Sequence, residues 1–129
     1  MRLLLDPRAR RALFGSWCLG WALVLVESLR PMPEIPLGLS DKLAHFAGYA
    51  AMAAGIAGFA HRPREIARWA LLAVAMGGLI EVAQGFTPTR SPDPLDFLAN
   101  TAGVAVGAAV AISWGALVIA PLRRRLAAA

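Results

Sequence analysis

Four apolar segments dominate the chain, and most polar residues lie in the short stretches between them. The segments cover residues 12–29, 43–60, 69–86 and 95–120. A helix needs about 20 predominantly apolar residues to cross a hydrocarbon core about 30 Å thick. The pattern therefore predicts an all-α membrane protein, a compact bundle of four transmembrane helices that forms a single domain over residues 1–129.

The composition agrees with a protein that lies in a membrane. Hydrophobic residues make up 58% of the 129 residues, charged residues only 16%, and the mean hydropathy is +0.59. Ordinary soluble domains are less apolar and carry more charge. Little sequence remains outside the four segments, so we expect no separate soluble domain.

Basic residues are concentrated in alternate connections between the segments. Three groups of arginines precede the first segment, separate the second from the third, and follow the fourth: Arg2, Arg8, Arg10 and Arg11; Arg62, Arg64 and Arg68; Arg123, Arg124 and Arg125. The other two connections hold fewer basic residues, namely Arg30, Lys42 and Arg90. By the positive-inside rule, both termini are predicted to be cytoplasmic. The net charge of +5 then reflects membrane orientation, so we expect a lipid bilayer as the partner and no nucleic acid.

The remaining polar residues gather where the predicted helices reach the opposite, outer side of the membrane. They lie in three stretches: SDKLAHFAGY (40–49), EVAQGF (81–86) and TRSPDPLDFLAN (89–100). At about 1.5 Å per helical residue, His45, Glu81 and Asn100 lie about 6 to 9 Å inward of the helix ends. Three polar side chains are therefore expected at the depth of the outer leaflet.

Helical spacing places these polar residues on shared faces together with small residues. The faces are Asp41, His45 and Tyr49; Gly78, Glu81 and Gly85; and Asp96, Asn100, Gly103 and Gly107. Small residues allow membrane helices to approach closely, and ionisable groups are costly in lipid, so these faces are predicted to point into the bundle. We expect the buried Glu81 to be paired there with His45, Lys42 or Arg90.

The polar residues also follow a characteristic order along the chain. They are Asp41, Lys42, His45 and Tyr49, then Glu81 and Gln84, then Arg90, Asp93, Asp96 and Asn100, followed by Gly103 and Gly107. This order resembles the VanZ-like family of small bacterial membrane proteins, over about half of the chain. The resemblance implies a multi-pass protein of the bacterial inner membrane with a role in the cell envelope and an association with resistance to the glycopeptide teicoplanin. It does not imply a particular reaction.

The candidate site residues divide by the chemistry that their side chains offer. Candidates for catalysis are Asp41, His45, Glu81 and Asp96, and candidates for contacts with a substrate are Lys42, Tyr49, Gln84, Arg90, Asp93 and Asn100. A carboxylate beside His45 can orient the imidazole for acid–base chemistry. Alternatively, Lys42, Arg90 and the helix N-termini suit an anion, such as a lipid-linked ligand that bears phosphate.

Simpler structural roles compete with these functions. Asp93 before Pro94 fits a helix N-cap, and Asp41 and Asp96 are favoured near helix N-termini by the helix dipole. Lys42 and Arg90 can serve as counterions for the carboxylates. Tyr49 can be a packing residue.

A metal site is conceivable from His45, Glu81, Asp93 and Asp96. However, the sequence has no HExxH motif and no pair of cysteines with metal-binding spacing, so we predict neither a metal nor another cofactor.

Three functional classes remain open. We predict an outward-facing site that binds or modifies a cell-envelope amphiphile, without deciding whether a reaction is catalysed. The alternative is a noncatalytic scaffold or interaction module whose polar cluster stabilises the bundle. An ion-coupled transporter is disfavoured because the inner halves of the helices lack polar residues, although an oligomer can supply a path that the monomer lacks.

Overall fold

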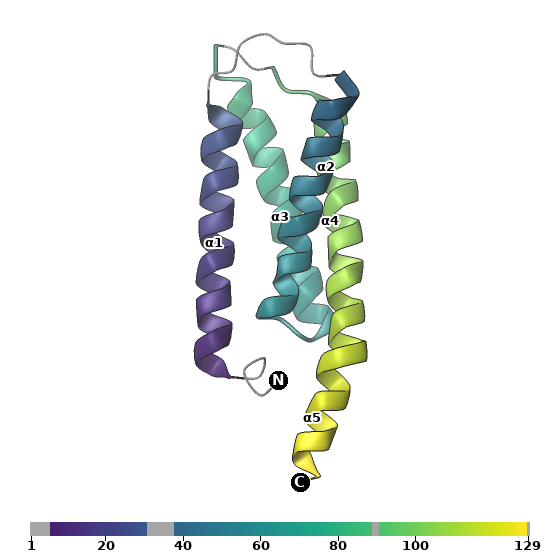
Figure 1. Ribbon diagram of the computed structural model, residues 1–129. Coiled ribbons are helices and arrows are strands. Elements are labelled where there is room, and N and C mark those ends of the chain that lie inside the picture. Colours follow the sequence, from purple (N-terminus) through teal and green to yellow (C-terminus); the bar gives the residue numbers. More distant parts are fainter. Residues whose placement is uncertain (1–5, 31–37, 89–90, 129) are drawn as a thin grey trace.

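Helices account for most of the residues that the structure describes. The computed structural model describes residues 6–30, 38–88 and 91–128. Its helices are α1 (Pro7–Leu29), α2 (Gly38–Ala54), α3 (Pro63–Gln84), α4 (Pro94–Trp114) and α5 (Ala120–Ala127). A 3₁₀ turn, Gly55–Gly58, extends α2, and a π-helical segment, Gly115–Ile119, joins α4 to α5. Helices α4 and α5 follow one another without a break and form a single rod, and Figure 1 shows that this rod, α1, α2 and α3 run along roughly one common direction.

The predicted all-α membrane fold is confirmed. Within the described residues, three helices are long and apolar enough to cross a membrane: Pro7–Leu29, Pro63–Gln84 and Pro94–Ala127. The 17 residues of α2 and the four of its 3₁₀ extension together span about 33 Å, at about 1.5 Å per α-helical and about 2.0 Å per 3₁₀ residue. This length also matches a bilayer core of about 30 Å.

The helices differ from the apolar segments mainly at their ends. The first begins at Pro7 and the third at Pro63, each five or six residues before its apolar segment, because proline fits the first turn of a helix. At α1 the Asp6 side chain also caps the helix, accepting from the Arg8 N–H at 2.8 Å. Hydropathy thus locates the part of each helix within the membrane, whereas prolines and caps locate the helix end.

Helices α2 and α4 pack in close contact through two glycines of α4. A Cβ atom at Gly103 would overlap the carbonyl oxygen of Phe46, and one at Gly107 would overlap that of Ala50. Only glycine permits this approach, as the small-residue face of this segment predicted. The contact places the first turns of α2 directly beside those of α4.

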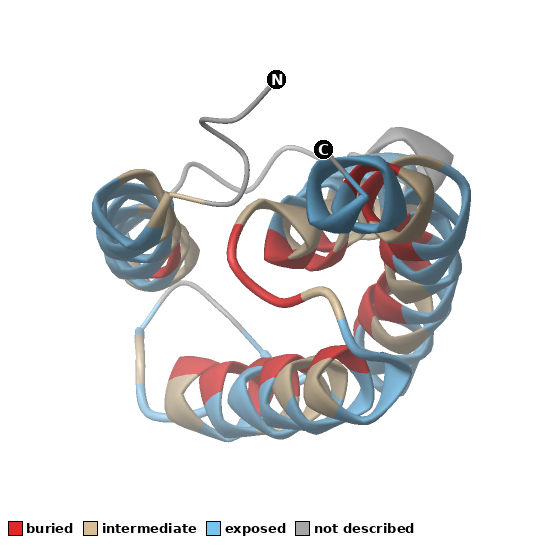
Figure 2. Ribbon diagram, turned by 90° about the horizontal axis from the view of Figure 1, so that it is seen from below, coloured by how far each residue is buried: buried red, intermediate tan, exposed pale blue. Residues whose placement is uncertain are grey.

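Helix α1 stands at the edge of the bundle and is attached by aromatic side chains. Trp21 is its one buried residue among those described, and Figure 2 shows the rest of α1 exposed or partly exposed, while the buried residues of the other helices face one another. Trp17 packs edge-on against Phe59 and Trp69, with ring centroids 5.3 and 5.4 Å apart. Its indole N–H donates to the Met52 carbonyl at 2.8 Å.

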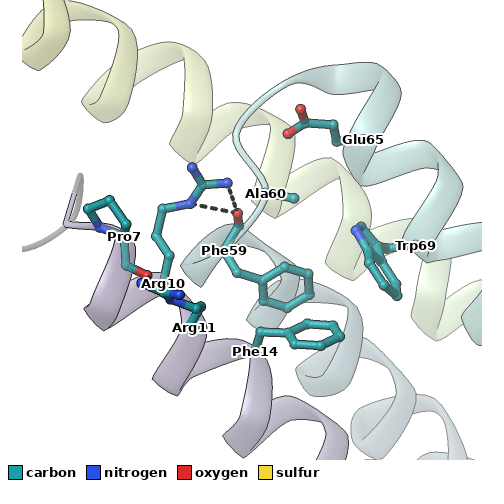
Figure 3. A pocket seen from close by; sticks show the side chains of 8 residues that line it. All are labelled: Pro7, Arg10, Arg11, Phe14, Phe59, Ala60, Glu65 and Trp69. Carbon is teal, nitrogen blue, oxygen red and sulfur yellow. Dashed lines mark hydrogen bonds between the residues drawn. The ribbon is translucent and has the colours of Figure 1, made fainter.

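Arg10 adds a polar attachment at the beginning of α1. Its Nε and Nη2 atoms donate to the Phe59 carbonyl oxygen at 3.0 and 2.5 Å (Figure 3). This contact lies beside a shallow pocket of about 620 Å³ that Arg11, Glu65 and Trp69 help to line. The polar contacts and aromatic rings together fix α1 against the turn between α2 and α3.

The beginning of α1 and the end of α5 lie at the same end of the bundle. Figure 1 shows that α1 begins and α5 ends there, whereas α2 and α4 begin, and α3 ends, at the opposite end. The candidate site residues that the structure describes lie at the latter end. Which end faces the cytoplasm stays a prediction from the positions of the arginines.

Candidate functional site

Seven polar side chains from three helices lie together at the end of the bundle remote from the beginning of α1 and the end of α5. We call them the polar cluster: Asp41, Lys42 and His45 of α2, Glu81 of α3, and Asp93, Asp96 and Asn100 at the start of α4. Glu81, Asp96 and Asn100 are buried. The close contact between α2 and α4 places these groups within reach of one another.

His45 lies at the centre of the polar cluster. Its Nδ1 atom is 3.0 Å from the Oδ1 atom of Asn100, a residue that is 1% exposed. On the other side of the ring, Nε2 lies 3.9 Å from Asp41 Oδ1 and 3.8 Å from Asp96 Oδ2. One edge of the imidazole is therefore held by an amide, and the other faces two carboxylates.

Glu81 has different partners from those that we expected. Its Oε2 atom accepts the backbone N–H of Asp93 at 3.2 Å, and its Oε1 atom lies 3.5 Å from Asn100 Nδ2. The predicted pairing with Lys42 or His45 is wrong for the described residues, and Arg90 lies outside them. The reason is the register of the helices: α4 begins beside the end of α3, so a peptide N–H and an amide reach Glu81 first.

Lys42 instead joins the two aspartates at the start of α4. Its ammonium group donates to Asp93 Oδ2 and Asp96 Oδ1. Asp93 also caps α4, accepting the Leu95 N–H at 2.8 Å, so the expected capping role is confirmed. Hydrogen bonds from Lys42 and then from the Leu95 N–H lower the pKa of the Asp93 carboxyl group. Lys42 thus acts as a counterion, the simpler of the roles considered for it.

Two further candidate residues connect the site to α1. Gln84 is 3% exposed, and its Nε2 atom donates to the Ser28 carbonyl at 3.0 Å. Tyr49 is 4% exposed and packs edge-on against Trp21, with centroids 5.4 Å apart. The Tyr49 hydroxyl oxygen is buried without a hydrogen-bond partner in the described structure. An unpartnered buried hydroxyl is costly, and this one lies close to Gly77 of α3, inside the bundle.

The small residue that lies against Tyr49 was not singled out from the sequence. A Cβ at Gly77 would lie 3.0 Å from the Tyr49 ring, and Gly77 is buried whereas Gly85 is exposed. Gly77 precedes Glu81 by four residues, so helical spacing contained the signal. The predicted face of α3, which included Gly78 and Gly85, is rotated slightly about the helix axis from the face that is buried.

A groove of about 300 Å³ runs beside the polar cluster, between α1, α2 and α3. Its lining consists of Val24, Glu27 and Ser28 of α1, Asp41, Ala44, His45, Gly48 and Tyr49 of α2, and Gln84 of α3. The contribution of α1 is a finding of the structure, because Glu27 and Ser28 were not singled out from the sequence. The groove gives Asp41 and His45 access to a ligand.

The second histidine lies far from this groove, at the other end of the bundle. His61 Nδ1 is 3.4 Å from Arg123 Nη2. Desolvation, together with the charges of Arg10 and Arg123, lowers the pKa of His61. The two histidines therefore occupy separate environments, and His61 belongs to the basic end of the bundle.

Comparison with known protein families identifies the family of this chain. The sequence profile described as VanZ/LLP1 matches residues 12–118. The chain belongs to this family. The match includes the apolar parts of all four membrane-length rods, so the VanZ-like assignment extends beyond the half of the chain that carries the polar pattern. No curated protein and no solved structure shows a significant match to the chain.

The geometry favours some chemistries at this VanZ-like site over others. His45 is oriented by an amide and reaches the groove, as a proton-transferring group requires. An anion site is less well supported, because the Lys42 ammonium is already bound by two carboxylates. An anion at this point would therefore compete with Asp93 and Asp96 for Lys42.

Proposed function

We propose that this VanZ-like protein binds the polar head group of a cell-envelope amphiphile in the groove between α1, α2 and α3. The observation that carries the proposal is the mixed lining of the groove. Val24, Ala44 and Gly48 supply apolar wall, whereas Asp41 and His45 supply ionisable groups. Such a combination matches a molecule with an apolar chain and a polar head.

Two small residues keep one side of the groove open. Ala44 and Gly48 are exposed on α2, one turn apart, and a Cβ at Gly48 would meet no atom within 4 Å. An acyl or isoprenoid chain can therefore lie against α2 while its head group reaches His45. In this arrangement the ligand does not have to enter the interior of the helix bundle.

The hydrogen-bonding groups of the groove indicate the kind of head group. Carboxylates of Glu27 and Asp41 and the oxygen atoms of Ser28, all in the lining of the groove, can accept hydrogen bonds. We infer a ligand that donates hydrogen bonds through hydroxyl or amino groups. A lipid-linked ligand that bears phosphate, as considered from the sequence, would need a cation other than the occupied Lys42.

The proposal includes the orientation of the protein in the inner membrane. The basic residues favour cytoplasmic termini and therefore an extracytoplasmic groove. An amphiphile involved in cell-wall assembly would meet the groove there, and an altered supply of such a molecule would connect the protein with teicoplanin resistance. His45, flanked by carboxylates, is the group that would transfer a proton if the bound molecule is modified.

Filling the groove tests the proposal. Gly48→Leu places a branched side chain in the open space, whereas Gly15→Leu adds the same side chain at an exposed position of α1, where a Cβ also meets no atom within 4 Å. Native mass spectrometry of gently purified protein should detect a retained amphiphile in the wild type and in Gly15→Leu, but not in Gly48→Leu. Equal retention by the two variants would exclude the groove as the binding site.

A noncatalytic scaffold is the second candidate, and the dense bonding of the polar cluster favours it. Asn100 connects His45 to Glu81, and Lys42 connects Asp93 to Asp96. Such networks can fix the register of membrane helices without binding a ligand. Under this alternative, Glu81→Gln would impair folding and function together, whereas a ligand site would lose function in a protein that still folds.

A further inference from the structure

Three potential metal ligands of the polar cluster converge on one point. Asp41, His45 and Asp96 each offer one ligand atom, and these atoms lie within 4.8 Å of one another. They come from two helices that the Gly103 and Gly107 contacts hold together. The sequence suggested His45, Glu81, Asp93 and Asp96 as conceivable ligands, whereas the structure places Asp41, rather than Glu81 or Asp93, in a group with His45 and Asp96.

The orientation of Asn100 determines which nitrogen of His45 is free. Because Asn100 Nδ2 is directed at Glu81, its Oδ1 atom is the one that faces His45 Nδ1. Oδ1 is an acceptor, so Nδ1 carries the proton and donates it. In the neutral imidazole, Nε2 then presents its lone pair to Asp41 and Asp96.

The distances around Nε2 fit a shared ion better than direct hydrogen bonds. Separations of 3.9 and 3.8 Å from the two carboxylate oxygens exceed hydrogen-bonding distance. Ligand atoms about 2.0 to 2.2 Å from a tetrahedral Zn²⁺ lie about 3.3 to 3.6 Å from one another. Shifts of a few tenths of an ångström would bring the two carboxylate oxygens to these distances from Nε2. The two oxygens, which lie within 4.8 Å of each other, would have to approach each other by about 1 Å.

The surrounding groups support a cation at this point. Four carboxyl groups lie in the polar cluster, and Lys42 is bonded to Asp93 and to Asp96 Oδ1, which leaves Asp96 Oδ2 directed at His45. The hydrogen bond from His45 Nδ1 to an amide oxygen is also the arrangement that orients a metal-binding histidine. Asn100 would hold the ring, and Glu81 would hold Asn100.

We propose that Asp41, His45 and Asp96 bind a divalent transition-metal ion of the Zn²⁺ or Mn²⁺ class, with Asn100 and Glu81 as positioning residues. One imidazole nitrogen and two carboxylate oxygens suit these ions. Asp41 and His45 also line the groove, so a remaining coordination position is accessible to a hydroxyl or amino group there. The metal site deepens the proposed function. Binding of the ion does not depend on the proposed function, but the identity of the molecule that the ion would contact does.

Metal titration of the purified full chain tests the site. Tag-free protein in detergent, stripped with EDTA, is titrated with ZnCl₂ and with MnCl₂ by isothermal calorimetry. The wild type should show saturable binding of at least one of these ions, and His45→Ala and Asp41→Asn should each weaken it about tenfold or more. Asn100→Ala should weaken it by about 10- to 100-fold through the loss of ring orientation.

His61→Ala is the matched control, because it removes the other histidine at the opposite end of the bundle. It should leave the affinity unchanged. Asp41→Asn keeps the shape of the side chain and affects an ionic contact with His45 in the described structure. It therefore still tests metal binding if His45→Ala does not fold. Absence of saturable binding, or equal binding by the wild type and Asp41→Asn, overturns the inference.

A second readout separates this inference from the proposed function. Lipid retention is measured by native mass spectrometry in samples with and without EDTA. Metal binding without a retained amphiphile supports the ion site and refutes the proposed function. A retained amphiphile without metal binding supports the proposed function and refutes the ion site. Loss of the amphiphile in EDTA supports both.

Discussion

Replacement of Glu81 by alanine tests how the polar cluster is stabilised. Glu81 is 6% exposed and accepts hydrogen bonds from the Asp93 N–H at 3.2 Å and from Asn100 Nδ2 at 3.5 Å. Glu81→Ala removes the acceptor and leaves both donors without it. A buried donor without a partner costs about 1 to 3 kcal/mol, and the longer bond to Asn100 contributes the smaller share.

We therefore expect Glu81→Ala to lower the free energy of unfolding by about 2 to 4 kcal/mol. Glu81→Gln keeps one acceptor and the size of the side chain, so its effect should be about 1 kcal/mol. Hydrogen bonds between membrane helices average only about 0.6 kcal/mol. A loss near that value for Glu81→Ala would show that Asn100 finds another hydrogen-bond partner in the variant.

The assay is equilibrium unfolding in mixed micelles, followed by circular dichroism. Glu65→Ala is the control, because this glutamate lies on α3 at the other end of the bundle and is partly exposed, 4.0 Å from Arg62. Its removal should change stability by less than about 1 kcal/mol. The account of the cluster is refuted if the two alanine variants are equally stable.

Three other predictions concern packing, pH and position. Gly107→Ala should destabilise the bundle by about 1 to 3 kcal/mol or more, because its Cβ would overlap the Ala50 carbonyl oxygen; Gly48→Ala, in open space, should not, as thermal unfolding will show. Because hydrogen bonds from Lys42 and Leu95 hold the pKa of Asp93 below its ordinary value of 3.8, its carboxylate stabilises the fold above pH about 4, and this contribution is lost as the pH falls further. Asp93→Asn, which can still cap α4, should therefore lose less thermal stability than the wild type between pH about 6 and about 3; equal losses would contradict this. Finally, cysteines at His45 and Glu81 should be joined by a short bifunctional reagent in membranes, whereas cysteines at Ala57 and Glu81 should not, and the opposite result would disprove the convergence of the polar residues.

Hydropathy was sufficient to predict the membrane helices, because each rod must present about 20 apolar residues to lipid. The ends of the helices depended on other signals. Pro63 began α3 six residues before its apolar segment, and the helix after Pro94 continued into the basic residues as α5. A charged turn outside the bilayer remains helical without adding to the apolar pattern.

The candidate site was predictable where residues share one helix and less so where they pair between helices. Spacing by four placed Asp41 and His45 on one face, and the structure has them 3.9 Å apart. The partner of Glu81 depended on the register between α3 and α4, which spacing within one helix does not specify. For the same reason the sequence did not reveal the groove, in which Val24 and Ser28 of α1 approach α2.

Residue-specific photo-cross-linking tests the central claim most directly. A photoreactive amino acid replaces Gly48, in the groove, in one variant and Gly15, which is exposed on α1, in another. The cross-linked adducts of the two variants are compared in the membranes of living cells. Mass spectrometry should find one class of envelope amphiphile strongly enriched on the Gly48 protein, whereas adducts at Gly15 should follow the bulk lipid composition. Adducts at Gly48 that also follow the bulk composition would contradict a specific ligand in the groove.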